Sequence, residues 1–98
     1  MNIKLINRKI QVLFLEPPKE NEGIYGTASF DNLNIKVNKT LCFQQQQITL
    51  SHELIHHMSN GNTQIKLLTE KQTEALAIEF LYFIRHNPKI IEYLKRKK

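Results

Sequence analysis

In the N-terminal part of the chain, apolar and polar residues alternate as expected for β-strands that are buried on one face. Two alternating runs lie between Ile3 and Leu15, and the polar residues Asn7-Arg8-Lys9 between them suit a hairpin turn. Two further runs lie on either side of Asp31-Asn32, between Ile24 and Val37. Pro17-Pro18 separates the two units. The pattern predicts two β-hairpins.

The apolar period changes to that of a helix in the second half of the chain. Leu50, Leu54 and Met58 recur at helical spacing. Their periodicity stops at Ser59-Asn60-Gly61-Asn62, where Gly61 suits a left-handed cap. The pattern therefore predicts a first helix that ends at this polar segment.

Two more helices are indicated downstream. Thr69 and Gln72 have the spacing of a capping box, and the periodic segment that follows stops at Asn87-Pro88. Pro88 suits the first turn of a short third helix with Asn87 as its cap. Strands followed by helices predict an α+β fold, in which a small antiparallel sheet of two hairpins packs on two or three helices.

Length and composition indicate one ordinary globular domain. A chain of 98 residues cannot support two sizeable cores, so we predict a single domain over 1–98, with strands mainly in 1–43 and helices in 44–98. Hydrophobic residues make up 41% of the chain and charged residues 23%, which argues against wholesale disorder and against a fibrous repeat.

The net charge of +5 is concentrated at one end of the chain. Lys95-Arg96-Lys97-Lys98 supplies four of the positive charges, so the rest of the chain is nearly neutral. A basic segment after a helix is usually solvated surface, and nucleic acid is therefore not the expected partner. The sequence indicates no oligomeric state.

The single cysteine, Cys42, excludes an intramolecular disulfide. Its apolar neighbours suggest a small buried side chain rather than a nucleophile. A basic-then-apolar leader and an apolar segment of membrane-spanning length are both missing from the pattern. We therefore expect a cytoplasmic protein that does not associate with membranes.

The predicted first helix carries the run His52-Glu53-Leu54-Ile55-His56. Residues four apart lie one turn above each other, so His52 and His56 can present their imidazoles to a single metal ion. Glu53 projects about 100° around the axis from His52, where its carboxylate can take a proton from an attacking water. The apolar stripe of this helix lies on its opposite face, so core packing does not explain the histidines. This arrangement predicts a zinc site with Glu53 as the general base.

A catalytic zinc usually has three protein ligands, so a third is expected downstream. The candidates are Glu70, Glu74 and Glu79. Glu74 shares a helix side with the apolar stripe from Ala77 to Ile84, whereas Glu79 projects from the opposite side and should be solvated. Glu70 lies one turn before Glu74 and would either support a ligand histidine or bind the metal itself. We predict Glu74 as the third ligand, with Glu70 as the alternative.

The remaining polar candidates are less specific. His57 follows the ligand pair and is expected to be structural, and His86 is expected to be a helix-end residue. A donor to the oxyanion of a tetrahedral intermediate is expected among Tyr25, Tyr82 and His57, which sequence does not rank.

These residues carry a resemblance to a known family. The run from Gln47 to His56, preceded by 34–37 and followed by 74–80, resembles the ImmA/IrrE-type zincin metallopeptidases, especially short forms from phages and mobile elements. The resemblance covers the stretch from about Tyr25 to Pro88. It implies a minimal zincin-like domain with one Zn²⁺. In such a domain the metal ligands would be His52, His56 and Glu74, and the general base would be Glu53.

The family resemblance also implies a function. It implies a zinc metalloendopeptidase, a hydrolase that cuts a peptide bond of a protein substrate in the cytoplasm of a bacterial host cell. A regulatory protein of a phage or mobile element is the suggested substrate. The strand at Asn32–Asn38 would border the substrate cleft and pair with an extended substrate.

Two positions depart from the family pattern, since Ile55 replaces a common glycine and Ile78 replaces a common asparagine. The resemblance also implies the cleavage of a repressor, with which the family is associated. These departures weaken that implication but leave the zinc residues in place. The alternative function is a zincin-like binding module whose structural zinc helps it sequester a partner without cleaving it. The intact Glu53 argues against that alternative, because a purely structural site needs no base.

Overall fold

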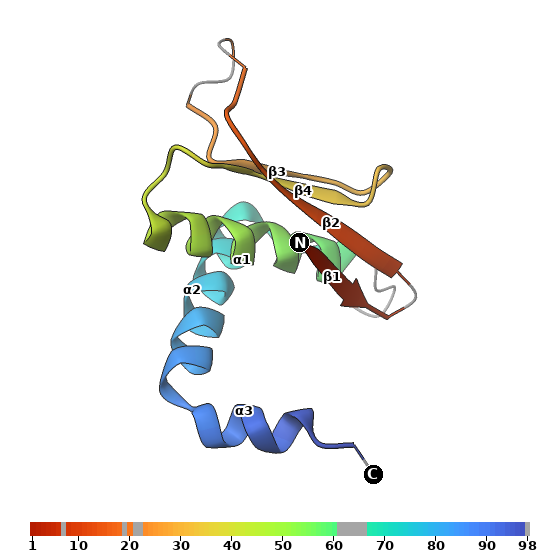
Figure 1. Ribbon diagram of the computed structural model, residues 1–98, viewed down its shortest axis with the longest axis vertical. Coiled ribbons are helices and arrows are strands. Elements are labelled where there is room, and N and C mark those ends of the chain that lie inside the picture. Colours follow the sequence, from red (N-terminus) through yellow and green to blue (C-terminus); the bar gives the residue numbers. More distant parts are fainter. Residues whose placement is uncertain (7, 19, 21–22, 61–66, 98) are drawn as a thin grey trace.

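The computed structural model describes residues 1–6, 8–18, 20, 23–60 and 67–97. Four strands precede three helices along these residues, which confirms the α+β class (Figure 1). The elements are β1 (Asn2–Leu5), β2 (Arg8–Leu15), β3 (Gly26–Ser29), β4 (Asn34–Asn38), α1 (Phe43–Asn60), α2 (Glu70–His86) and α3 (Pro88–Lys95).

The sheet is mixed, with strand order β1-β2-β4-β3. Both predicted hairpins are present, because β1 pairs antiparallel with β2 and β3 pairs antiparallel with β4. The turn predicted at Asn7-Arg8-Lys9 is wrong in part, because Arg8 and Lys9 already pair with β1 as residues of β2. The two hairpins join through a parallel pair, in which Val12 of β2 lies opposite Ile35 of β4. The predicted antiparallel sheet is therefore wrong at its centre. Alternation of residues specifies strands and tight turns, whereas the docking of one hairpin on another depends on contacts that are distant in sequence.

One face of the sheet forms the core. Its buried centre consists of four β-branched side chains from the two central strands, Ile10, Val12, Ile35 and Val37. Helix α1 lies across this face and packs Leu50 and Leu54 against the cluster, as the apolar stripe predicts (Figure 1). Met58, the third residue of that stripe, lies instead in a groove between α1 and α2 with Leu76 and Phe80.

Helix α2 packs against α1, and its first turn is fixed by the predicted capping box. The backbone N–H of Gln72 donates to Oγ1 of Thr69 at 3.1 Å, and the backbone N–H of Thr69 donates to Oε1 of Gln72 at 2.9 Å. This reciprocal pair satisfies two backbone donors and determines where the helix begins. The residue that follows Thr69, Glu70, is consequently held at the first position of α2.

Helix α3 begins at Pro88, contacts α2 and extends away from the sheet (Figure 1). Asn87 precedes it as expected, but its side chain donates to the carbonyl oxygen of Phe83 at 3.0 Å and so closes α2 rather than capping α3. The predicted cap at Gly61 lies outside the described residues. Cys42 is exposed, contrary to the expected burial, because it directly precedes the first turn of α1.

None of the helices within the described ranges is both long enough and apolar enough to cross a membrane.

Candidate metal centre

Three side chains from α1 and α2 converge on one point. The Nε2 atoms of His52 and His56 lie 3.1 Å apart, as one helical turn between them allows. Glu70 reaches both rings, with Oε2 3.1 Å from Nε2 of His52 and Oε1 2.8 Å from Nε2 of His56. His52, His56 and Glu70 therefore lie close enough together to hold a metal ion.

Glu74 lies against the other nitrogen of the His52 ring. Its Oε2 is 2.6 Å from Nδ1 of His52, so the protonated Nδ1 donates to the carboxylate. A carboxylate at Nδ1 keeps the proton on that nitrogen and leaves the Nε2 lone pair free for a metal. The structure thus brings the predicted His52 and His56 together with Glu70, the alternative third residue. Glu74 as a ligand stays a prediction, which this geometry does not favour.

The start of α2 explains why Glu70 rather than Glu74 faces both histidines. The capping box at Thr69 places Glu70 in the first turn, where its negative charge is also favoured by the helix dipole. The fully buried residues of α2 are Thr73 and Ala77. The buried face of the helix therefore shares Ala77 with the predicted apolar stripe but does not extend along it to Ile84, which is exposed. The stripe predicts a different rotation of the helix, in which Glu74 faces the metal.

The electrostatic environment of His52 reflects its two carboxylate partners. Burial by itself lowers the pKa of His52, but the hydrogen bonds to Glu74 and Glu70 outweigh it, so the pKa lies above the ordinary value. Glu74 and Glu70 come from one helix and approach opposite nitrogens of the ring. Their combined negative charge makes this corner of the molecule suited to a cation.

Glu53 lies beside the three converging residues and is 9% exposed. Burial raises the pKa of its carboxyl, and the nearby Glu70 raises it further, whereas His52 partly opposes the increase. A carboxylate whose pKa is raised in this way is a better proton acceptor than an ordinary surface glutamate. The structure therefore places Glu53 as its sequence position predicts, next to the histidine pair.

Gly26 lets the first residue of β3 approach Glu53 closely. A Cβ atom at Gly26 would lie 3.6 Å from Cγ of Glu53 and only 2.6 Å from Cγ2 of Thr49. A glycine where a strand begins is a signal of close backbone approach, which apolar periodicity does not register. Gly26 thus belongs to the site although it carries no functional group.

His52 and Glu70, two of the three converging side chains, line an open pocket of about 410 Å³ between α1, α2 and the start of β3. Of the three candidate oxyanion donors, Tyr25 lines this pocket. Tyr82 stacks on His86 instead, with 4.1 Å between ring centroids. The complete lining is Tyr25, Gly26, Gln45, Ile48, Thr49, His52, Glu53, Glu70 and Glu74.

His57 is structural, as expected, because it is 1% exposed. Its Nε2–H donates to the backbone carbonyl of Asn34 at 2.9 Å, and Phe30 packs against its ring at 5.0 Å between centroids. The hydrogen bond ties α1 to β4 on the side away from the pocket. His86 lies exposed near the end of α2, and Glu79 is exposed as predicted.

The strand expected to border the cleft is not the one that does so. Asn32–Asn38 was expected to offer a free edge, but β4 lies between β2 and β3 in the sheet. The outer strand on this side is β3, and its first residue, Gly26, lines the pocket. The prediction for β4 is wrong because the hairpin docks on β2 through its second strand, which leaves its first strand outside.

Comparison with known proteins finds no family model, curated protein or solved structure that matches this chain.

Proposed function

We propose that this chain is a zinc-dependent metallopeptidase of the ImmA/IrrE zincin type, which hydrolyses a peptide bond of a protein substrate. The observation that carries the proposal is the position of Glu53. Its buried carboxylate lies directly beside the cluster of His52, His56 and Glu70 and lines the same open pocket as His52 and Glu70. A metal site used only for structure would not require a base there.

The donor atoms fit zinc. Two ligands that each lie 2.0–2.1 Å from a tetrahedral zinc ion are about 3.3 Å apart. The two imidazole Nε2 atoms are 3.1 Å apart, and Glu70 approaches them with different oxygens, Oε2 at 3.1 Å from His52 and Oε1 at 2.8 Å from His56. One oxygen of Glu70 and the two ring nitrogens therefore lie close enough to share an ion after small side-chain adjustments. Two imidazoles and one carboxylate make up a common catalytic zinc set, which leaves a further position for water or substrate.

The side chains around the cluster have distinct roles in this mechanism. Zinc, when bound, supplies Lewis acidity that polarises the scissile carbonyl and acidifies the attacking water. Glu53 accepts the proton of that water and returns it to the leaving amine, for which its raised pKa is suitable. Glu74 holds His52 in the tautomer whose Nε2 faces the cluster. The hydroxyl of Tyr25, which lines the pocket, donates to the developing oxyanion.

The position of β3 at the edge of the sheet is consistent with a protein substrate that binds in extended conformation. One side of β3 pairs with β4, and its other side is the edge of the sheet. An extended segment that pairs with this edge forms main-chain hydrogen bonds, and Gly26 brings it next to Glu53. A regulatory protein of a phage or mobile element, in the cytoplasm of a bacterial host, remains our proposed substrate.

The test separates metal binding from cleavage. Zinc-loaded protein is incubated with fluorescently labelled casein and with a mixed peptide library, and cleavage is followed by fluorescence and mass spectrometry. We expect Glu53→Gln to keep its zinc but to lose roughly 100- to 10,000-fold in rate, as loss of a general base does. Tyr25→Phe should lower kcat more than it changes KM. The exposed Glu79→Gln is the matched control and should cut like the unmodified chain.

Two outcomes would contradict the proposal. Cleavage that survives in Glu53→Gln at the original rate would show that Glu53 is not the base. A zinc-loaded chain that retains a partner protein but cuts neither it nor the library would favour the alternative, a zincin-like module that sequesters its partner.

A further inference from the structure

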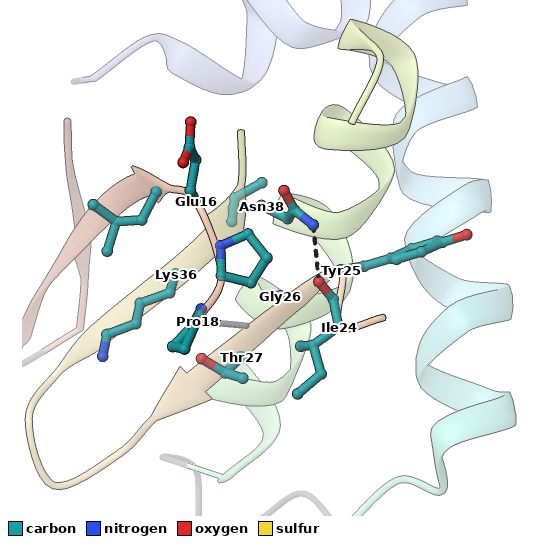
Figure 2. A pocket seen from close by; sticks show the side chains of 11 residues that line it. Glu16, Pro18, Ile24, Tyr25, Gly26, Thr27, Lys36 and Asn38 are labelled. Carbon is teal, nitrogen blue, oxygen red and sulfur yellow. Dashed lines mark hydrogen bonds between the residues drawn. The ribbon is translucent and has the colours of Figure 1, made fainter. Parts of the chain in front are cut away.

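A second pocket, of about 400 Å³, is drawn in Figure 2 and shares two lining residues with the metal pocket. It is formed where β2 and β4 end and β3 begins, and Pro17-Pro18 closes one side of it. Its lining is mostly apolar, and the complete set is Leu15, Glu16, Pro17, Pro18, Ile24, Tyr25, Gly26, Thr27, Lys36, Val37 and Asn38. None of the residues that form the metal cluster belongs to it.

Hydrogen bonds hold the walls of this pocket in place. Asn38 donates from Nδ2 to the carbonyl oxygen of Ile24 at 3.1 Å (Figure 2). Its backbone N–H donates to the carbonyl oxygen of Tyr25 at 2.8 Å. The backbone N–H of Lys39 donates to the carbonyl oxygen of Leu15 at 3.0 Å. The wall formed by Leu15, Ile24, Tyr25 and Asn38 is therefore preformed, and a ligand would not have to order it.

Two residues link this pocket to the metal centre. Tyr25 and Gly26 line both pockets. Gly26 lies so close to α1 that a Cβ atom there would be 3.6 Å from Cγ of Glu53. Ile24, on the far wall, precedes Gly26 by two residues, which corresponds to about 7 Å of extended chain. A peptide that follows the edge of β3 past Glu53 would consequently reach the second pocket within about two or three residues.

We propose that this pocket binds an apolar side chain of the substrate, about two or three residues from the cleaved bond, and so selects the cleavage sequence. The proposal rests on the proposed peptidase function. The walls favour an aliphatic or aromatic side chain, since Leu15, Ile24 and Val37 contribute apolar surface. The two charged residues of the lining, Glu16 and Lys36, have opposite signs and are both exposed, so they do not favour a charged ligand of either sign.

Binding is tested without cleavage by NMR on the zinc-loaded, ¹⁵N-labelled full chain. The probe is N-acetyl-leucinamide, and N-acetyl-asparaginamide is the polar probe of matched size. The leucine probe should cause saturable shifts of the amides of Gly26, Thr27 and Asn38, with an affinity about tenfold above that of the polar probe. Equal shifts for both probes, or none at these amides, would overturn the proposal.

Substitutions identify the site. Ile24→Glu and Leu15→Glu place a carboxylate on opposite walls, and each should remove the preference for the leucine probe. Both residues are partly exposed, so neither change has to disrupt the core. Leu94→Glu, an exposed apolar position on α3, is the matched control and should bind like the unmodified chain. A preference that survives in both pocket variants would place the binding elsewhere.

Selectivity is tested with a positional peptide library and the zinc-loaded chain. We expect an apolar preference of about tenfold at one position near the cleaved bond, which Ile24→Glu converts into a preference for lysine or arginine. Cleavage with no such preference, or one that Ile24→Glu leaves unchanged, would overturn this inference but not the peptidase function. Probe binding without any cleavage would contradict the peptidase function and leave the pocket as an apolar binding site.

Discussion

Nδ1 of His52 lies 2.6 Å from Oε2 of Glu74, whereas Nε2 of the same ring lies 3.1 Å from Oε2 of Glu70. The two carboxylates therefore approach one imidazole from opposite sides, and only Glu70 also reaches His56. A metal held by both histidines would lie on the side of Glu70. We infer that Glu70 binds the metal and that Glu74 holds His52 in the required orientation.

The first prediction distinguishes these two carboxylates by zinc affinity. Glu74→Gln should weaken zinc binding by roughly 10- to 100-fold, because it removes only the support of a ligand histidine. Glu70→Gln should weaken it more, because it removes a charged donor from the cluster. Affinities are measured by competition with a chromophoric chelator, and the exposed Glu79→Gln is the control. If Glu74→Gln is the more damaging change, the ligand predicted from sequence is correct and our assignment of Glu70 is wrong.

The position of α2 shows what local sequence signals can specify and what they cannot. The capping box at Thr69 and the stop at Asn87-Pro88 were visible in the sequence, since each depends on neighbouring residues. Whether Glu70 or Glu74 faces the histidines depends on how α2 rotates and tilts against α1. Thr73 and Ala77, which are fully buried, set that rotation, and apolar periodicity alone did not identify Thr73 as interior.

In the sheet, too, the sequence predicts the features that depend on neighbouring residues but not those that depend on long-range packing. Alternation located both hairpins, including the turn around Asp31-Asn32. It did not reveal that β2 pairs in parallel with β4, which leaves β3 outermost and next to the metal pocket. The pair of His52 and Glu53 was predictable because both lie on one helix, whereas the contribution of Gly26 comes from a strand more than twenty positions away.

The second prediction concerns the effect of metal on folding. His52 and His56 belong to α1 and Glu70 to α2, so a bound ion would link the two helices. Free zinc at a hundred times its dissociation constant would add about 2.7 kcal/mol to the free energy of unfolding. For a chain of this length the Tm should rise by about 10–20 °C. Circular dichroism with zinc and with a chelator measures the shift, and His56→Ala should show almost none. An equal shift in His56→Ala would place the metal elsewhere.

The third prediction concerns His57, the buried histidine that does not face the cluster. His57→Ala removes a buried ring and leaves the carbonyl of Asn34 without its hydrogen-bond donor. We expect the free energy of unfolding of the metal-free protein to fall by about 3 kcal/mol in urea titrations. Under conditions in which the variant is folded, its zinc affinity should be nearly unchanged.

The exposed His86 provides the control for His57. Its ring stacks on Tyr82 at the surface, so His86→Ala should change the free energy of unfolding by less than about 1 kcal/mol. A His57→Ala variant that is as stable as the unmodified chain but has lost its zinc would show that His57 is a ligand rather than a structural residue.

The fourth prediction concerns the close approach of β3 to α1. Gly26→Ala introduces a Cβ atom 2.6 Å from Cγ2 of Thr49 and 2.9 Å from the carbonyl oxygen of Lys36, so strand or helix must shift. We expect the free energy of unfolding to fall by about 1–3 kcal/mol. Gly23→Ala should leave it nearly unchanged, because a Cβ there would meet no atom within 4 Å among the described residues beyond its chain neighbours. Adding Thr49→Ser to Gly26→Ala removes the methyl contact but not the contact with Lys36, so it should restore stability only in part. Full stability of Gly26→Ala alone would contradict the packing of β3 against α1.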